Sequence, residues 1–144
     1  MIKSIHVEGD VSFAEVLADY GRGDQGPFLV NGLASLGKII VGGDWESSSI
    51  LAGASAGEDR LFGTLDDELP AANRASAARI AQIVISGAIS GTHSELDALD
   101  HYGIVARTIG SLKVQGVAMN LAANRVDSMS LGSTDDMRLQ ELRM

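Results

Sequence analysis

The chain has 144 residues, and 11 Lys and Arg residues against 19 Asp and Glu residues give it a net charge of −8. Such an acidic chain is a poor partner for nucleic acid, no apolar run is long enough to span a membrane, and we recognise no signal peptide. The absence of cysteine excludes disulfides and cysteine-bound zinc. The length predicts one domain over residues 1–144, and the 17 glycines with 4% aromatic residues favour thin, repeated layers of small aliphatic side chains.

Four segments repeat one pattern, in which an aliphatic residue is followed, after two spacers, by two alternating aliphatic residues and then a glycine. The copies begin at Ile2, Leu36, Ile80 and Ile109, and they end at Gly9, Gly43, Gly87 and Gly116. The alternation is typical of a strand with one buried face, and the glycine permits a sharp bend. Because copies at variable spacing are typical of stacked strands joined by variable loops, we predict an all-β solenoid with irregular loops, in which Ile5, Ile39, Ile83 and Leu112 share one column.

Two local signals favour helices instead. Ser12 to Glu15 matches a capping box, and Gly21 could end a helix over residues 13–20. Residues 71–82 are rich in alanine and follow Pro70, which is a good first-turn residue. Together these signals give the alternative of a single-domain α/β fold, and one short helix over residues 71–79 is compatible with either fold.

The repeated pattern, with Asp10 and Asp44 directly after two of its glycines, resembles the β-helical repeats of very large, planctomycete-type bacterial cell-surface proteins. The segment from Ser49 to Ala54 is similar to the same repeats, and the segment from Asp100 to Leu142 looks like their closing unit. The resemblance implies a right-handed parallel β-helix, a surface or adhesive role, and a chain that is a terminal fragment of a longer exported protein. It supplies no catalytic residues.

A parallel stack of strands has two end coils whose strand edges need a partner. The alternating stretch from Met137 to Leu142 could be a capping strand at one end. The other solution is a homo-oligomer that forms through an end coil. We also expect Asp10 and Asp44 to bond back to the backbone of their own turns.

An acidic loop flanked by glycines contains the carboxylates of Asp59, Asp66, Asp67 and Glu68. Carboxylate oxygens are the ligands that calcium prefers, although this loop lacks the spacing of an EF-hand. Calcium binding is therefore one interpretation of the loop, and an ordinary acidic surface without any cofactor is the other.

Two further clusters invite a chemical interpretation. His93, Glu95, Asp97, Asp100 and His101 could bind a divalent metal or form a solvated polar loop. Residues 21–26 have the glycine spacing of a dinucleotide-binding motif, but the motif needs a helix to follow it. The residues after Gly26 are a poor helix start, so we expect a plain loop, and the Arg-Gly-Asp tripeptide at 22–24 is most simply a chance match.

The function that these patterns favour is a non-enzymatic structural or adhesion-type β-helix module of a bacterial surface-like protein. Its partners would be a second copy, a surface polysaccharide or a protein. The alternative is a carbohydrate-active β-helix enzyme, a polysaccharide lyase or hydrolase, for which focused carboxylates and aromatic platforms are needed. Trp45 and Tyr102 are the platform candidates, although Trp45 also fits a packing role beside a turn.

Overall fold

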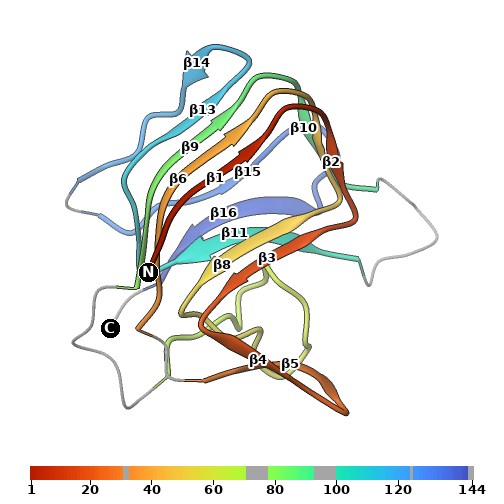
Figure 1. Cartoon of the computed structure of the whole chain (residues 1–144), viewed down its shortest axis with the longest axis vertical. Coiled ribbons are helices and arrows are strands. Elements are labelled where there is room, and N and C mark those ends of the chain that lie inside the picture. Colours follow the sequence, from red (N-terminus) through yellow and green to blue (C-terminus); the bar gives the residue numbers. More distant parts are fainter. Residues whose placement is uncertain (31–32, 71–77, 93–99, 124, 143–144) are drawn as a thin grey trace.

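A computed structural model describes residues 1–30, 33–70, 78–92, 100–123 and 125–142. Within these residues the chain forms strands and no helix. The first sheet contains, in spatial order, β1 (Ile2–Val7), β6 (Ser35–Val41), β9 (Arg79–Ile85), β13 (Leu112–Val114) and β14 (Val117–Ala118), and β12 (Thr108–Ile109) also pairs with β9 (Figure 1).

Two further sheets and one hairpin complete the fold. The second sheet is the short set β10 (Ile89–Ser90), β7 (Trp45–Glu46) and β2 (Val11–Ser12). The third sheet runs in the order β15 (Ser128–Ser130), β16 (Met137–Glu141), β11 (Tyr102–Ala106), β8 (Ser49–Ala52) and β3 (Glu15–Ala18). The hairpin is β4 (Tyr20–Gly23) with β5 (Gly26–Leu29). The chain enters the three sheets in turn, first as β1, β2 and β3, and then as β6, β7 and β8.

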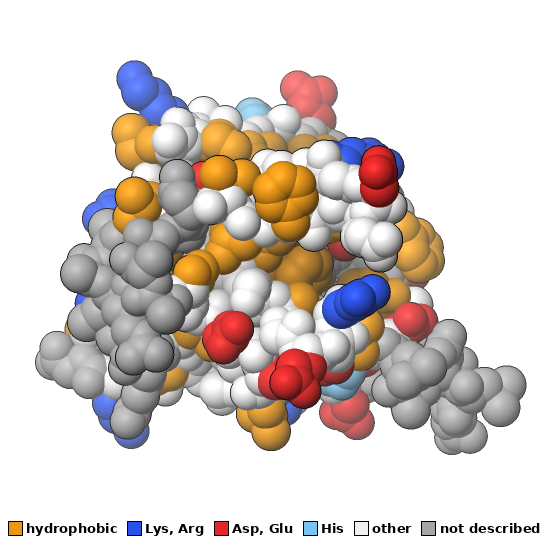
Figure 2. Space-filling model, turned by 90° about the horizontal axis from the view of Figure 1, so that it is seen from below, with side chains coloured by type: hydrophobic (Ala, Val, Ile, Leu, Met, Phe, Trp, Pro, Cys, Tyr) orange, Lys and Arg blue, Asp and Glu red, His pale blue; other side chains and the backbone are white. Residues whose placement is uncertain are grey.

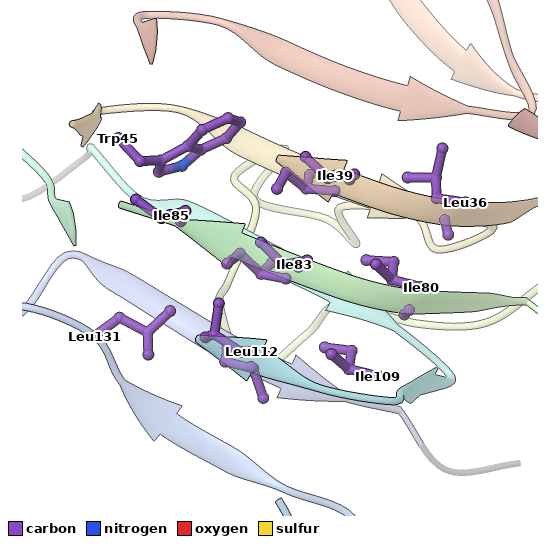
Figure 3. Close-up of a cluster of buried hydrophobic side chains, with 14 of the residues drawn as sticks. Leu36, Ile39, Trp45, Ile80, Ile83, Ile85, Ile109, Leu112 and Leu131 are labelled. Carbon is purple, nitrogen blue, oxygen red and sulfur yellow. The ribbon is translucent and has the colours of Figure 1, made fainter. Parts of the chain in front are cut away.

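The predicted register of the repeated pattern is confirmed. β1 pairs parallel with β6, β6 with β9, and β9 with β13, which places Ile5, Ile39, Ile83 and Leu112 in one column. Figure 3 shows Ile39, Ile83 and Leu112 one beneath another in the buried cluster. The pattern therefore predicted which residues are opposite one another in the first sheet.

The prediction of a right-handed parallel β-helix is corrected, because the fold is a set of small sheets that mix parallel and antiparallel pairs. β14 runs antiparallel to β13, β15 runs antiparallel to β16, and β4 and β5 form a separate antiparallel sheet. The fourth copy of the pattern shows the physical reason. Gln115 and Gly116 both have positive φ, 50° and 79°, which is the backbone of a two-residue hairpin turn, so the chain reverses there.

The α/β alternative is also wrong for the residues that the structure describes. In the capping-box segment, Ser12 ends β2 and Glu15 begins β3, with Phe13 at a φ of 50° between the two strands. The proposed helix at 71–79 lies largely outside the described residues, and from Arg79 onward the chain is strand β9. Burial of alternate residues against a sheet overrides these weak local helix signals.

The spacing inside the repeated pattern requires an irregular strand. Leu36, Ile39 and Val41 are all buried, yet residues three apart face opposite sides of a regular strand. Gly37 lies at the irregularity, where a Cβ atom would collide with the backbone carbonyl oxygen of Lys3. At this position of the second copy, the strand therefore needs a residue without a side chain, because the two backbones approach closely.

The aspartates after the glycines bond to the neighbouring strand connection instead of their own turn. Oδ1 of Asp10 accepts a hydrogen bond from the backbone N–H of Asp44 at 2.8 Å. Oδ1 of Asp44 accepts one from the N–H of Ala88 at 2.7 Å. A Cβ on Gly43 or Gly87 would collide with these carboxylates, so the glycines are needed for space and not for a positive φ.

The third sheet is buried on both faces. Ile50 and Ile104 face the central core between the sheets, whereas Leu51 and Val105 face a second cluster with Phe62. Continuous apolar runs are typical of strands covered on both sides. The stretch from Met137 to Leu142, which was predicted as a cap, forms β16 inside this sheet, between β11 and β15.

Candidate functional site

The two ends of the strand stack differ in their free edges. β1, β2 and β3 are each the last strand of their sheet, and within the described residues each pairs on one side only. Apolar side chains remain exposed here: Met1 is 88% exposed and Phe13 73%. A hollow of about 280 Å³ lies between the start of β1 and the end of β3, with Met1, Ile2 and Leu17 in its lining. We call this end, which comprises β1, β2, β3 and Met1, the open end.

The opposite end is closed by segments that turn back on the stack. β14 and β15 cover the first and third sheets with short antiparallel strands. The free side of β10 meets the turn before β16, where the N–H of Gly91 donates to Oγ1 of Thr134 at 2.7 Å and the N–H of Thr92 to Oδ2 of Asp136 at 2.8 Å. Very short or covered edge strands are a usual protection against pairing with another chain. We call this the closed end.

Residues 53–70 cover the outer face of the third sheet. Phe62 and Ala54 pack there against Leu51 and Val105, and the ring of Phe62 meets the ring of Tyr20 edge-on, with centroids 6.4 Å apart. The Tyr20 hydroxyl donates a hydrogen bond to the carbonyl oxygen of Ala54. This segment, which we call the covering loop, is therefore joined both to the sheet and to the β4–β5 hairpin.

Asp67 is the buried anchor of the covering loop. Its side chain is 7% exposed, and Oδ2 accepts a hydrogen bond from the N–H of Gly63 at 2.7 Å. Burial raises the pKa of Asp67 to about 7, against the weaker opposing effect of that hydrogen bond. Burial also raises the pKa of Tyr20, with smaller contributions from the charges of Asp67 and Glu15. Oδ1 of Asp67 has no hydrogen-bond partner.

The four predicted calcium ligands have separate roles in this loop. Both oxygens of Asp66 are occupied, Oδ2 by the N–H of Glu58 and of Asp59 and Oδ1 by the Thr64 hydroxyl, and the Thr64 bond is the largest cause of the lowered pKa of Asp66. Asp59 bonds to the N–H of Leu61, and the backbone of Glu68 pairs with Ser55. Among the described residues, no three His, Cys, Asp or Glu side chains lie together in a way that could hold a metal. Calcium binding by Asp59, Asp66, Asp67 and Glu68 stays a prediction.

Two adjoining pockets lie along the covering loop. One, which we call the corner pocket, has a volume of about 380 Å³ and lies where the chain passes from the second sheet to the third. The other, of about 450 Å³, lies between the loop and the β4–β5 hairpin. Both are lined by Glu15, Arg60 and Phe62. We call the two together the aromatic groove, because five of the six aromatic residues of the chain line it, namely Phe13, Tyr20, Phe28, Phe62 and Tyr102.

The face that bears the hairpin is visibly hollowed. Figure 2 looks at the molecule from the side of β4 and β5 and shows hydrophobic side chains on the floor of a hollow, with acidic and basic side chains at its rim. Trp45, the other predicted platform, is absent from the groove because it is buried in the core, where its Nε1–H donates to the carbonyl oxygen of Ser48 at 2.9 Å. The packing role is the correct interpretation of Trp45, and Tyr102 is the candidate that reaches a pocket.

Two polar side chains of the corner pocket lack hydrogen-bond partners. Oγ of Ser47 and Nδ1 of His101 are buried atoms that make no hydrogen bond. The whole Ser47 residue is only 2% exposed. Ser47 follows β7 and has a positive φ of 45°, as Phe13 does after β2, the strand that pairs with β7. The strained backbone is therefore a property of the corner. Oγ of Ser47 is therefore not hydrogen-bonded to His101 in this structure.

The remaining predicted clusters are resolved only in part. Of the possible metal cluster, His93, Glu95 and Asp97 lie outside the described residues, whereas Asp100 and His101 line the corner pocket. Residues 21–26 form the antiparallel β4–β5 hairpin, so no helix follows the glycines and a dinucleotide-binding turn is excluded there. Sequence reasoning missed the aromatic groove, because its residues are scattered from Phe13 to Tyr102 and no spacing joins them.

No protein-family model, no curated protein and no solved structure matches this chain. In the part of the chain that the structure describes, no helix has the length and apolar character that crossing a membrane requires.

Proposed function

We propose that the protein is a non-enzymatic structural module of the adhesion type that assembles by joining its open end to the open end of a second copy. The observation that carries this proposal is the difference between the two ends of the stack in the part of the chain that the structure describes. One end finishes in the unpaired edges of β1, β2 and β3, and the other finishes in short antiparallel strands and a covering turn. A structural role is also the one that the resemblance to bacterial cell-surface proteins suggests.

The occupant that we favour is a second copy, because an isolated extended peptide could pair with only one of the three edges. A head-to-tail arrangement would need edges of similar length at both ends, whereas the closed end finishes in the short antiparallel strands β14 and β15 and in the turn before β16. Open end against open end is a two-fold arrangement, which closes after two copies. The exposed side chains of Met1 and Ile2 would then be buried between the copies.

The backbone of β1 shows which groups remain free for such pairing. The carbonyl of Val7 accepts a hydrogen bond from the N–H of Gly42, so Val7 faces β6. In a strand, consecutive residues direct their N–H and C=O groups to opposite sides. The N–H of His6 therefore points away from β6, toward the free side of the open end.

A matched pair of proline variants tests the proposal. His6→Pro removes an edge donor that the single chain does not use, and His6 is an exposed residue at the open end. Ala118→Pro does the same at the closed end, because the bond from Met119 N–H to Leu112 and the pairing of Val114 with Val117 leave the N–H of Ala118 on the free side of β14. Ile2→Lys provides a second open-end variant that retains every backbone donor.

The measurement is light scattering after size-exclusion chromatography. We expect the unmodified chain and Ala118→Pro to have twice the 15.0 kDa mass of one chain, and His6→Pro and Ile2→Lys to have the mass of one. Far-UV circular dichroism checks that each variant is folded. A monomeric unmodified chain at millimolar concentration would overturn the proposal, and so would a folded dimer of both open-end variants.

A further inference from the structure

We infer that the aromatic groove is a binding site for a neutral oligosaccharide. The inference is carried by other observations than the pairing of open ends, although Phe13 and Glu15, which line the groove, lie at the open end as well. Each of the two pockets, about 380 and 450 Å³, has the size of an ordinary small-molecule site, and the lining residues that they share place them next to each other.

The distribution of aromatic side chains is the first observation. In a chain with only six aromatic residues, five line this groove, and Phe13 and Phe28 remain 73% and 53% exposed. Apolar side chains that gather in an exposed groove are a usual mark of a binding site. The ring face carries negative charge density, and the C–H groups on the flat face of a pyranose are the apolar, weakly positive surface that suits it.

The polar lining selects the charge of the ligand. The groove presents carboxylates, from Glu15 and Asp100, and a guanidinium, from Arg60, on the same walls. A strongly anionic ligand would be repelled by the carboxylates and by the net charge of −8. Hydroxyl groups both donate and accept, so a neutral polyol can bond to both kinds of wall.

The unpartnered atoms of the corner pocket are the second observation, independent of the rings. Oγ of Ser47 and Nδ1 of His101 are buried without hydrogen-bond partners, and leaving a buried polar group unpaired is costly. Both residues line the corner pocket. A sugar hydroxyl in this pocket would complete the hydrogen bonding of Ser47 if the serine side chain adopts a rotamer that faces the pocket.

The groove is also held in place before a ligand arrives. On its floor, the N–H of Gly103 donates to Oγ of Ser49 at 3.1 Å. Gly63 of the covering loop packs directly on Gly103, since a Cβ on Gly63 would lie 3.0 Å from the Cα of Gly103. Asp67 holds Gly63 from the other side. A site whose walls are fixed by the fold loses less entropy when it binds.

The test is affinity electrophoresis and titration calorimetry of the full chain with defined neutral glycans. The probes are hexasaccharides of β-linked glucose, α-linked glucose and β-linked N-acetylglucosamine, with polygalacturonate as the anionic comparison. Trp45 is buried away from the groove, so its fluorescence is not the readout. We expect at least one neutral hexasaccharide to bind, and polygalacturonate to bind more weakly or not at all.

The variants Arg60→Asn and Phe28→Ala remove one polar and one aromatic wall. Asparagine suits the φ of 62° at Arg60, and Phe28 is exposed, so both variants should fold. Each should weaken binding about tenfold. Arg79→Asn, an exposed arginine on β9, and Leu65→Ala, an 86% exposed leucine of the covering loop, line neither pocket and should bind normally.

Three outcomes would overturn the inference: no heat and no retardation with any neutral probe, equal binding by the groove variants and their controls, or preference for polygalacturonate. A monomeric protein that still binds the neutral glycan would sink the pairing of open ends and leave this site standing. The failures of the two proposals are thus distinguishable.

Discussion

The open end and the closed end are built on the same repeated strand pattern, yet they treat equivalent residues differently. Val7 is partly exposed at the open end, whereas Val41, its partner one strand further in, is fully buried. At the other end, Val114 has the same position in the pattern and is covered by the β13–β14 hairpin. The contrast teaches that burial in this fold is set by the number of neighbouring strands and not by the local sequence.

The hairpins make the difference between the two ends. β14 follows a two-residue turn, and β15 returns alongside β16. Both are antiparallel additions that end a parallel set of strands with short edges. No equivalent segment covers β1, β2 and β3 within the described residues. The same substitution at equivalent positions in an inner strand and in a strand of the open end can therefore show how much of its effect on stability comes from the neighbouring strands.

The largest expected effect is that of a charge in the central column. Val41→Asp puts a carboxylate at a residue with 0% exposure, and an unpaired buried charge costs several kcal/mol. We expect this variant not to fold. Val7→Asp, at the matched position in β1, should fold and lose about 1–2 kcal/mol as a single chain, because water reaches its side chain when the open end is unpaired. Urea unfolding measures both, and equal losses would show that the open end is as buried as the centre.

A smaller effect is expected from a methyl group at the corner glycines. A Cβ on Gly43 would lie 2.8 Å from the backbone nitrogen of Asp10 and collide with its carboxylate, whereas a Cβ on Gly9 would meet nothing within 4 Å. We expect Gly43→Ala to lower the free energy of unfolding by about 1–3 kcal/mol.

The matched variant Gly9→Ala should be neutral or stabilising by up to about 1 kcal/mol, because it restricts the unfolded chain only. Thermal unfolding of the two variants side by side tests the comparison. If Gly9→Ala were as harmful as Gly43→Ala, the open end would already be covered in solution, as it would be in a dimer that packs on this corner.

The last expected effect is a pH dependence from the covering loop. The pKa of Asp67 is raised from 3.8 to about 7 in the folded chain, so the folded state binds this proton more tightly than the unfolded state does. Its stabilising contribution is complete below the unfolded pKa and is lost as the pH rises through about 7.

Asp67→Asn retains an oxygen that can accept the bond from Gly63 but does not titrate. The melting temperature of the unmodified chain, relative to this variant, should therefore fall between pH 4 and pH 8. Asp66→Asn is the control, since the pKa of Asp66 is lowered and it should not titrate in this range. A constant difference between the unmodified chain and Asp67→Asn over the whole range would contradict the assignment.

The sequence predicted the ladder of the first sheet well, because the period of a half-buried strand is visible in Ile39 and Val41 and again in Ile83 and Ile85. It could not predict the hairpins, because Gly43 and Gly116 have the same position in the pattern but different backbones, and only Gly116 has a positive φ. The local helix signals at residues 12–15 were also misleading, because β2 and β3 pair with β7 and β8 and this pairing outweighs the local preference for a helix.

The candidate sites could be predicted only as residue types. The acidic residues of the covering loop are evident in the sequence, but not that Asp66 bonds to the loop backbone while Asp67 is buried. Tyr102 was a candidate platform, but its neighbours Phe13 and Phe62 come from distant segments. Contacts between segments so far apart depend on the three-dimensional path of the chain, which spacing in the sequence does not reveal.

By itself, the sequence determined that this chain forms strands and which aliphatic residues align, because the alternation of side chains is a property of each strand alone. Tertiary structure decided where parallel pairing stops, which end stays open and which rings gather into a groove. Those outcomes depend on whether a neighbouring strand, loop or hairpin removes a given surface from water, and that neighbour is supplied by a remote part of the chain.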